Sequence, residues 1–312
     1  MRVVFLGSPR FAVPSLEALA TSKYDVVAVY TQPDRAAGRG RTLVSPPVKE
    51  AASKKGLPVV QAESFQPTEA LAELAGYKPD VIVICAYGQI LPQSVLDIPP
   101  YQCLNVHFSL LPRHRGASPV AAAILAGDDF TGVTVQLVRK KLDTGPILAA
   151  AAVPILSGDN TGTLTDKLSV LGASLLLEAL EGWRRGEIKP RDQDEAAASY
   201  FGQVSKEDGE IDWRQPAAAI WRRVRAFYPW PGCYTTWRGK ILKIIESVPL
   251  TADKTVGAGE VTAIAGQDGG LGIGTGEGIL GVLKVQLEGK RVMDAAEFLR
   301  GQRDFIGAVL PR

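Results

Sequence analysis

Short apolar runs alternate with amphipathic stretches along the first half of the chain. The runs are rich in β-branched residues and are bounded by turn-forming residues, which predicts strands at Val3–Gly7, Val26–Tyr30, Val81–Ala86, Cys103–Val106, Gly132–Leu137 and Ile147–Pro154. Between them, apolar residues recur at helical spacing in Ser15–Thr21, Thr68–Ala75 and Pro119–Leu125. This alternation favours an α/β fold with a mostly parallel sheet that helices cover on both faces.

A longer amphipathic stretch follows, and the character of the sequence then changes. Leucines at helical spacing in Leu164–Trp183 predict a helix that closes the first domain. Residues 184–209 are charged and rich in alanine without clear periodicity, which is typical of a linker that crosses the surface. A short helix is expected near Pro216–Phe227.

The last part of the chain consists of short β-like runs separated by glycines. The predicted strands are Cys233–Trp237, Ile241–Ser247, Gly259–Ala265, Leu271–Gly274 and Ile279–Gln286. Short strands with turn signals between them favour a small barrel of the OB type. We therefore expect a Rossmann-like domain over residues 1–189, a linker over 190–205 and an OB-like β-barrel domain over 206–312.

Composition changes this picture little. The 312 residues are 46% hydrophobic and 22% charged, which is sufficient for a sizeable core in each of two domains. Lysine and arginine number 35 against 33 aspartate and glutamate, so affinity for nucleic acid would have to come from local clusters of cations. Three widely spaced cysteines, and no apolar run near the roughly 18–20 residues that span a bilayer, predict a cytoplasmic protein that binds no membrane.

Sequence signatures of nucleotide and metal sites are absent or misplaced. The glycines Gly276, Gly278 and Gly281 have the dinucleotide-binding spacing, but a β-like run follows them instead of a helix, so we assign them to barrel turns. The Gly-Lys pairs that end at Lys240 and Lys290 lack the serine or threonine of a phosphate loop. With two histidines and scattered cysteines, we expect no zinc site and no other metal.

Both histidines lie in one stretch, NVHFSLLPRHRG, residues 105–116. In a strand, the side chains of Asn105 and His107 face the same side. An amide donor beside a group that exchanges protons near pH 7 suits a reaction in which a carbonyl carbon becomes tetrahedral. Asp143, in a turn between two predicted strands, could orient the imidazole, although alone it would be read as an ordinary turn residue. His114 is expected to be a surface or packing residue.

The stretch NVHFSLLPRHRGASPV, followed by TGVTVQLVRKKLDTGPIL, resembles the signature of the 10-formyltetrahydrofolate-dependent formyltransferases. The shared pattern is Asn-x-His, Ser-Leu-Leu-Pro and Arg-Gly, then Thr-Gly-Val-Thr and Leu-Asp-Thr-Gly. The resemblance covers nearly the whole chain, and it implies that 10-formyltetrahydrofolate is the cosubstrate and that Asn105, His107 and Asp143 are catalytic. It also implies that the folate site is lined by Ser109, Leu110, Leu111 and Pro112.

Two further stretches resemble the family members that act on methionyl-initiator tRNA. Residues 31–49, TQPDRAAGRGRTLVSPPVK, resemble a loop inserted after the second strand, in which Arg35, Arg39 and Arg41 would contact phosphates. The alternative for this stretch is an ordinary solvated basic loop. Residues 225–232, RAFYPWPG, resemble the start of the C-terminal domain, so Arg222 and Arg225 are candidate RNA ligands. The aromatic residues nearby are assigned to the core: Trp221, Phe227, Tyr228 and Trp230.

The resemblance predicts a protein that transfers the formyl group of 10-formyltetrahydrofolate to the α-amine of methionyl-initiator tRNA, giving N-formylmethionyl-tRNA for translation initiation. We expect a monomer, because nothing in the sequence demands an oligomer. Two alternatives stay open. Formylation of an amino-sugar nucleotide would use the same three residues, whereas a non-catalytic RNA-binding protein would rely on the C-terminal barrel. The arginines and glycines between residues 35 and 41 favour tRNA over a sugar nucleotide.

Overall fold

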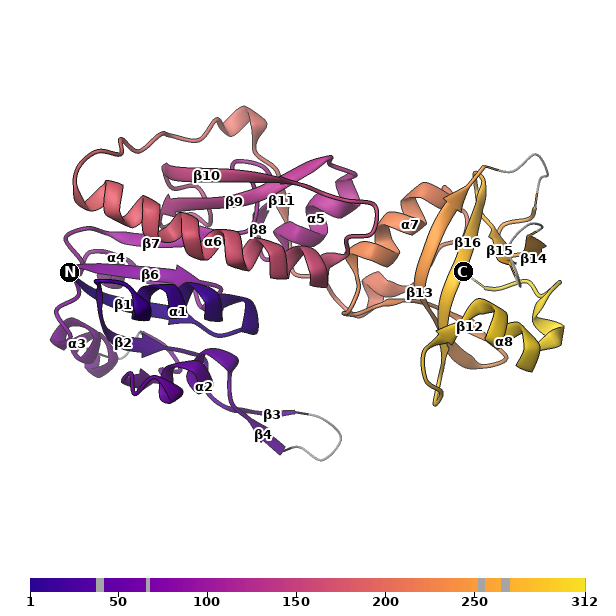
Figure 1. The fold of residues 1–312 in the computed structure, drawn as a ribbon, viewed down its shortest axis with the longest axis horizontal. Coiled ribbons are helices and arrows are strands. Elements are labelled where there is room, and N and C mark those ends of the chain that lie inside the picture. The colour runs from indigo at the N-terminus through magenta and orange to yellow at the C-terminus, as the bar shows by residue number, and fades with distance from the viewer. Residues whose placement is uncertain (38–41, 66–67, 252–255, 265–269, 312) are drawn as a thin grey trace. The chain divides into compact units, whose positions relative to one another are not determined.

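The computed structural model describes residues 1–37, 42–65, 68–251, 256–264 and 270–311. The chain divides into two compact units, each with its own sheet (Figure 1). The first unit contains residues 1–119, 130–154 and 165–201, and the second contains residues 120–129, 155–164 and 202–312. No helix in the described ranges has the length and apolar character needed to cross a membrane.

A seven-stranded sheet forms the centre of the first unit, in the order β10-β9-β7-β6-β1-β2-β5. The strands from β5 to β7 pair in parallel, whereas β9 is antiparallel to both β7 and β10. The bounds are β1 Arg2–Gly7, β2 Asp25–Tyr30, β5 Val59–Val60, β6 Val81–Cys85, β7 Cys103–His107, β9 Phe130–Leu137 and β10 Ile147–Pro154. The predicted α/β fold with a mostly parallel sheet is confirmed.

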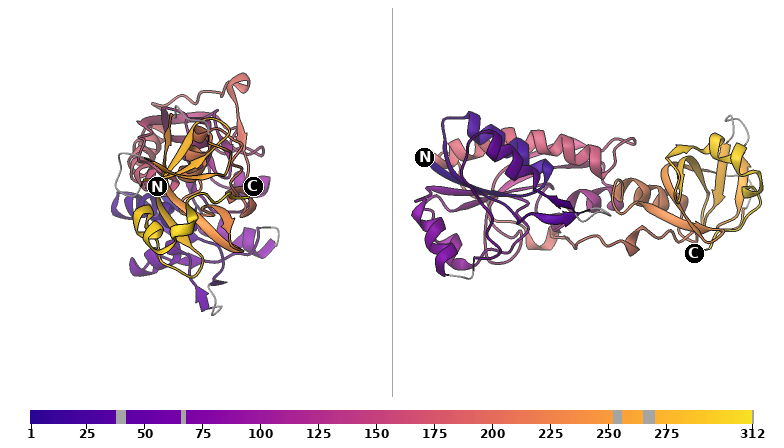
Figure 2. Two further views of the ribbon diagram at one scale, coloured as in Figure 1. Left: turned by 90° about the vertical axis from the view of Figure 1, so that its right-hand side faces the viewer. Right: turned by 90° about the horizontal axis from the view of Figure 1, so that it is seen from below.

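Helices cover both faces of this sheet, as the alternating pattern predicted. In the view from below in Figure 2, α1 and α6 lie on one side of the sheet and α3 lies on the other. Leu74 of α3 shares a buried cluster with Val4 and Ile82, while Gly172 of α6 packs at Val106. The helices of this unit are η1 Arg10–Ala12, α1 Val13–Thr21, α2 Pro47–Lys54, α3 Thr68–Gly76, α4 Gln93–Leu96, most of α6 Thr161–Arg184, and η2 Glu195–Ala197.

Two small strand pairs complete the first unit. β3 Arg35–Ala37 and β4 Thr42–Val44 pair antiparallel, so the predicted basic loop includes a short ladder. β8 Arg115–Gly116 pairs in parallel with β11 Tyr200–Phe201. The first compact unit therefore extends through part of the predicted linker, as far as Phe201.

The second unit is built on an antiparallel sheet in the order β12-β13-β16-β15-β14, with β17 paired to β16. Trp237, Phe298 and Phe305 pack edge to face in its core. The bounds of its elements are α5 Pro119–Ala126, η3 Glu207–Gly209, α7 Ala217–Ala226, β12 Cys233–Trp237, β13 Lys240–Leu250, β14 Val261–Ile264, β15 Gly270–Gly274, β16 Ile279–Leu287, β17 Met293–Asp294, α8 Ala295–Gly301 and η4 Arg303–Phe305. The sequence predicted a separate β domain here, but not the helix α8.

The glycines with dinucleotide-binding spacing lie at the start of β16. Gly278 has φ +79°, a left-handed conformation that suits a turn, and Gly281 lies within the strand itself. No helix begins at this turn, so it offers no helix N-terminus to a pyrophosphate.

Candidate active site

Asn105 and His107 project from the same face of β7, which pairs with β6 on one side and β9 on the other. In the antiparallel ladder with β9, Asn105 lies opposite Gln136 and His107 lies opposite Thr134. These four polar side chains therefore share one face of the sheet. The intervening residue Val106 points to the opposite face, where it contacts α6.

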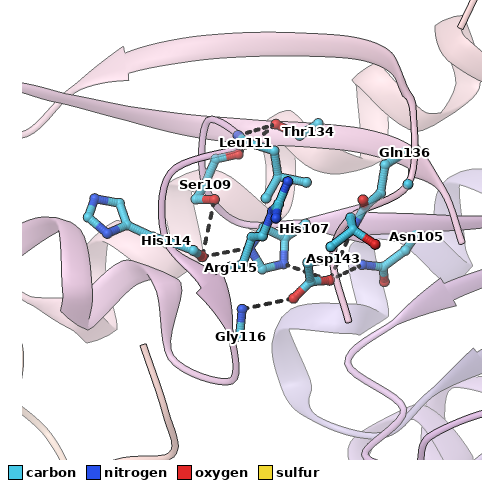
Figure 3. A network of polar contacts seen from close by, with 12 residues as sticks. Asn105, His107, Ser109, Leu111, His114, Arg115, Gly116, Thr134, Gln136 and Asp143 are labelled. Carbon is cyan, nitrogen blue, oxygen red and sulfur yellow. Dashed lines mark hydrogen bonds and ion pairs between the residues drawn. The ribbon is translucent and has the colours of Figure 1, made fainter. Parts of the chain in front are cut away.

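Asp143 reaches this face from the turn between β9 and β10. Its Oδ1 lies 3.0 Å from Gln136 Nε2, 3.5 Å from Asn105 Nδ2 and 3.7 Å from His107 Nδ1. Its Oδ2 accepts a hydrogen bond of 2.9 Å from the Gly116 backbone N–H (Figure 3). Two good donors thus hold the carboxylate beside the amide of Asn105 and the imidazole of His107.

The ring of His107 is buried and bounded by oxygen acceptors at both nitrogens. Nε2 lies 3.0 Å from the His114 carbonyl oxygen, and a carbonyl can only accept, so Nε2 carries a proton in this arrangement. Nδ1 faces the Asp143 carboxylate. A ring held in this way has a fixed orientation and can exchange a proton on the side of Asp143.

The stretch Ser109–Pro112 is built by internal hydrogen bonds. Thr134 Oγ1 donates to the Ser109 carbonyl at 2.7 Å and accepts from the Leu111 N–H at 3.1 Å. Ser109 Oγ donates to the Arg113 carbonyl at 2.6 Å (Figure 3 shows Ser109, Leu111 and Thr134). The hydroxyl and carbonyl groups of Ser109 are therefore used in hydrogen bonds that shape the loop. The other side chains of the loop can contact a ligand.

The position of the Leu110 side chain depends on a glycine in β9, Gly132. A Cβ added at Gly132 would lie 2.6 Å from Leu110 Cδ2 and 2.1 Å from the Ala151 carbonyl oxygen, so only glycine fits between them. Phe108, next to the catalytic candidate His107, turns to the other face of the sheet, near Gly172 of α6. The centroid of its ring lies 5.3 Å from that of the Phe11 ring.

His114 takes part in the site through its main chain. Its carbonyl accepts from His107 Nε2, and its N–H donates to Ser199 Oγ at 2.8 Å. His114 has φ +56°, a left-handed conformation uncommon for a residue other than glycine. The chain bends there, and this bend brings the N–H of Gly116 to Asp143.

The structure adds three side chains that the sequence analysis did not select. Thr134 and Gln136 are polar residues at alternate positions of the mostly apolar strand β9, a signal that could have identified them. Gln193 lies in the predicted linker, and its Nε2 donates to the carbonyls of Asp143 and Gly145. No periodic pattern marked Gln193, because its role depends on contacts far away in sequence.

The predicted RNA-binding arginines lie in different settings. Arg35 is exposed on β3 and donates to Gln32 Oε1, while Arg39 and Arg41 lie outside the described residues. Arg222 lies on α7, half-buried. Arg225 Nε and Nη2 donate at 2.7 Å to two backbone carbonyls, those of Asp159 and Leu156.

The guanidinium of Arg225 is also packed against an aromatic ring. It lies 4.3 Å from the centroid of Trp221, and burial lowers the pKa of Arg225. The assignment of the neighbouring aromatic residues to the core is confirmed for Phe227, which is buried. It is wrong for Tyr228 and Trp230, whose surfaces are 38% and 59% exposed, because the turn after α7 projects these rings into solvent.

Among the residues that the structure describes, no cluster of three or more histidine, cysteine, aspartate or glutamate side chains could hold a metal ion. Cys85, Cys103 and Cys233 are free thiols, and all three are buried. The polar groups at the site are thus an amide, an imidazole and a carboxylate. These three groups can stabilise an oxyanion and move a proton.

Comparison with known families now defines the class of this protein. The family model described as "Formyl transferase" matches residues 1–180, and the model described as "Formyl transferase, C-terminal domain" matches residues 203–303. The first match alone covers more than half of the chain, and the chain belongs to the formyl transferase family.

Curated relatives extend this match to the full length. A protein of Dehalococcoides mccartyi named methionyl-tRNA formyltransferase is 49% identical over 99% of this chain and 98% of its own length. A protein of Roseiflexus castenholzii with the same name is 50% identical over 97% of this chain and 96% of its own length. Both alignments extend across the two regions of this chain that the family models match.

Solved structures share the fold at lower identity. HypX from Aquifex aeolicus, in complex with tetrahydrofolic acid, has a TM-score of 0.61 at 23% identity and covers 99% of this chain and 48% of its own. WlaRD, a sugar 3N-formyl transferase, has a TM-score of 0.66 at 18% identity, with 93% of this chain and 99% of its own covered. At these identities the likeness concerns the fold alone.

Proposed function

We propose that this chain transfers the formyl group of 10-formyltetrahydrofolate to the α-amine of methionyl-initiator tRNA, giving N-formylmethionyl-tRNA for translation initiation. The observation that carries the proposal is the meeting of Asn105, His107 and Asp143 on one face of the sheet. It is found in a chain 49% identical over nearly its full length to a protein named methionyl-tRNA formyltransferase.

The chemistry follows from the three groups. The amine attacks the formyl carbon, a C–N bond forms, and the bond from that carbon to N10 of the folate breaks as a proton passes from the amine to N10. The N–H groups of Asn105, with the His107 ring, would stabilise the oxyanion that develops on the formyl oxygen. Asp143 would fix the ring and accept or relay the proton. No covalent intermediate with the enzyme is needed.

The folate site would be lined by Ser109, Leu110, Leu111 and Pro112. The hydrogen bonds of Thr134 with the Ser109 carbonyl and the Leu111 N–H give this loop a fixed shape before a ligand arrives. A preformed loop lowers the entropy cost of binding. Leu110 and Pro112 are only partly buried and supply apolar surface for the ligand.

The tRNA ligands would come from both units. In the first unit, Arg35 on β3, together with Arg39 and Arg41, would contact phosphates, and in the second unit Arg222 and Arg225 would lie near the RNA backbone. Arg225 already donates to two carbonyls, so its contribution would be to shape the surface around Arg222.

We place the catalytic domain in residues 1–189, the linker in 190–205 and an OB-like tRNA-binding domain in 206–312, in a monomeric cytoplasmic protein.

The experiment that tests the proposal compares acceptors directly. Purified protein with 10-formyltetrahydrofolate should form N-formylmethionyl-tRNA from charged initiator tRNA, and release of tetrahydrofolate should depend on that acceptor. An amino-sugar nucleotide, assayed in parallel, should stay unmodified. Formylation of the sugar alone would favour the alternative acceptor, and tRNA binding without any transfer would mean an RNA-binding protein.

A further inference from the structure

We propose that Gln193 is a positioning residue for the formyl transfer, because its side chain joins the turn that carries Asp143 to the loop, residues 114–116, that orients His107. This inference rests on the proposed function. Residues 191–201, here called the clamp segment, lie on the side of the sheet away from α6 in the view from below in Figure 2. This is the face from which Asn105 and His107 project, since Val106 contacts α6 on the other.

One end of the Gln193 amide holds the turn of Asp143. Its Nε2 donates at 2.8 Å to the Asp143 carbonyl and at 2.7 Å to the Gly145 carbonyl. The same nitrogen lies 3.2 Å from Gln136 Oε1. Gln136 Nε2 in turn donates to Asp143 Oδ1, so the amide of Gln193 fixes the backbone of the turn and that of Gln136 fixes its carboxylate.

The other end of the amide holds the loop after β7. Gln193 Oε1 accepts from Arg115 Nε at 3.0 Å and from Nη2 at 2.9 Å. The Arg115 side chain is 0% exposed and also donates to both carboxylate oxygens of Glu195, at 2.7 and 3.0 Å, and to the Tyr200 hydroxyl at 2.7 Å. The hydrogen bond with Glu195 raises the pKa of Arg115, so this buried cation stays charged.

The backbone of the clamp segment reinforces the same loop. The Arg115 N–H donates to the Ser199 carbonyl at 2.8 Å, and the His114 N–H donates to Ser199 Oγ at 2.8 Å. Residues 114–116 supply the carbonyl that orients the His107 ring and the N–H that holds Asp143 Oδ2. Gln193 thus contacts both this loop, through Arg115, and the backbone of the Asp143 turn.

Placement of Asp143 has to be accurate for the proposed reaction. Its Oδ1 is 3.5 Å from the Asn105 amide and 3.7 Å from the His107 ring, distances at which a small displacement changes every contact. Asp143 has φ +54°, so the turn has a conformation that a residue other than glycine adopts at a cost. A misplacement of about 1 Å lowers turnover by on the order of 10²-fold in enzymes that depend on such alignment.

Two substitutions separate the halves of the bridge. Gln193→Glu keeps oxygen acceptors for Arg115 but has no N–H for the carbonyls of the Asp143 turn, whereas Gln193→Ala removes both halves. We expect kcat for methionyl-tRNA formylation to fall at least tenfold in each variant, with both KM values within about twofold of wild type. Asp194→Ala is the matched control, because Asp194 caps η2 within the clamp segment and contacts the Ala196 N–H.

The outcomes distinguish this inference from the proposed function. A wild-type protein that formylates no methionyl-tRNA overturns the proposed function. The positioning role is then measured by amide hydrogen exchange at Gly116, whose N–H donates to Asp143 Oδ2, and we expect at least tenfold faster exchange in Gln193→Ala. The positioning role is overturned if amide exchange at Gly116 in Gln193→Ala is as slow as in wild type. It is also overturned if kcat of Gln193→Glu stays within twofold of wild type, or if Asp194→Ala loses as much kcat as the Gln193 variants.

Discussion

The amide of Asn105 carries two N–H groups, and its contact with Asp143 Oδ1 is long, at 3.5 Å. A donor is therefore left for the oxyanion that forms on the formyl group. We expect Asn105→Ala to lower kcat by about two to three orders of magnitude, as loss of one oxyanion-hole donor does elsewhere. The measurement is single-turnover formyl transfer at saturating substrates. Turnover near wild type would remove Asn105 from the mechanism, and an unchanged melting temperature serves as the control for folding.

Gly145, in the turn that carries Asp143, makes a second test at the scale of one residue. A Cβ at this position would lie 1.6 Å from the Leu137 carbonyl oxygen, which is backbone and cannot turn aside. We expect Gly145→Ala to destabilise the protein by about 1–3 kcal/mol, the usual cost of overpacking, and to reduce activity by displacing Asp143. Gly76→Ala is the control, since a Cβ there meets nothing within 4 Å.

Thermal unfolding measures the difference in stability between Gly145→Ala and the control Gly76→Ala directly. A variant with alanine at position 145 that melts at the wild-type temperature would show that the turn relaxes without cost. For a domain of this size, the predicted loss corresponds to a fall of roughly 2–4 °C for each kcal/mol.

Some residues of the candidate site could be predicted from local pattern, and others could not. The alternation of a strand is enough to place Asn105 and His107 on one face, because side-chain direction has period two. The neighbours of Asp143 required the fold, since Gly116 is 27 residues away from it and Gln193 is 50. A sequence offers no signal for contacts that two distant loops make after both have folded.

At the level of elements, long apolar strands such as β1, β6 and β9 were predicted within a few residues of their bounds. Their side chains are buried on both faces of the sheet, so burial alone explains the pattern. β8 and β11 contain two residues each and exist because they pair with each other, a reason that lies outside their own sequences. The same limit led us to read all of residues 190–205 as a linker, although β11 and η2 lie within it.

The β3–β4 hairpin allows a prediction about tRNA binding. Arg35 on β3 is exposed, and its single described bond, to Gln32 Oε1, leaves other N–H groups for a phosphate. We expect Arg35→Ala to weaken tRNA binding and to reduce the slope of log K against log salt by about 0.7–0.9, the share of one phosphate contact. Folate binding should be unchanged.

The control for this variant is Lys189→Ala, which removes an exposed cation beyond the end of α6. Binding is measured by fluorescence titration at several salt concentrations. If both variants give the wild-type slope, the hairpin is an ordinary solvated element and the RNA ligands lie elsewhere.

At the scale of the whole molecule, each compact unit contains at least one buried thiol that reports on its integrity. Cys85 and Cys103 lie on the neighbouring strands β6 and β7 of the first unit, and Cys233 lies on β12 of the second. Burial raises the pKa of all three thiols to about 12. Because the thiolate is the reactive form, a folded unit should resist alkylation even at pH 9.

These thiols also predict how stability depends on pH. A thiol in the unfolded chain loses its proton near pH 8.5, whereas the buried thiol keeps its proton until about pH 12. The folded state therefore binds more protons between these values, so the stabilising contribution is complete below pH 8.5 and is lost as pH rises above it. The slope is roughly 1.4 kcal/mol per pH unit for each thiol.

Urea unfolding at pH 8, 9 and 10, combined with alkylation and peptide mapping, checks both expectations together. The midpoint should fall progressively above pH 8.5, and Cys85 and Cys103 should become modified together because they share one sheet. Cys233 belongs to a different sheet, so its modification follows the unfolding of the second unit and need not coincide with theirs. Rapid modification of any of the three thiols in the folded protein at pH 8 would contradict their burial. A midpoint that stays constant up to pH 10 would contradict the raised pKa values.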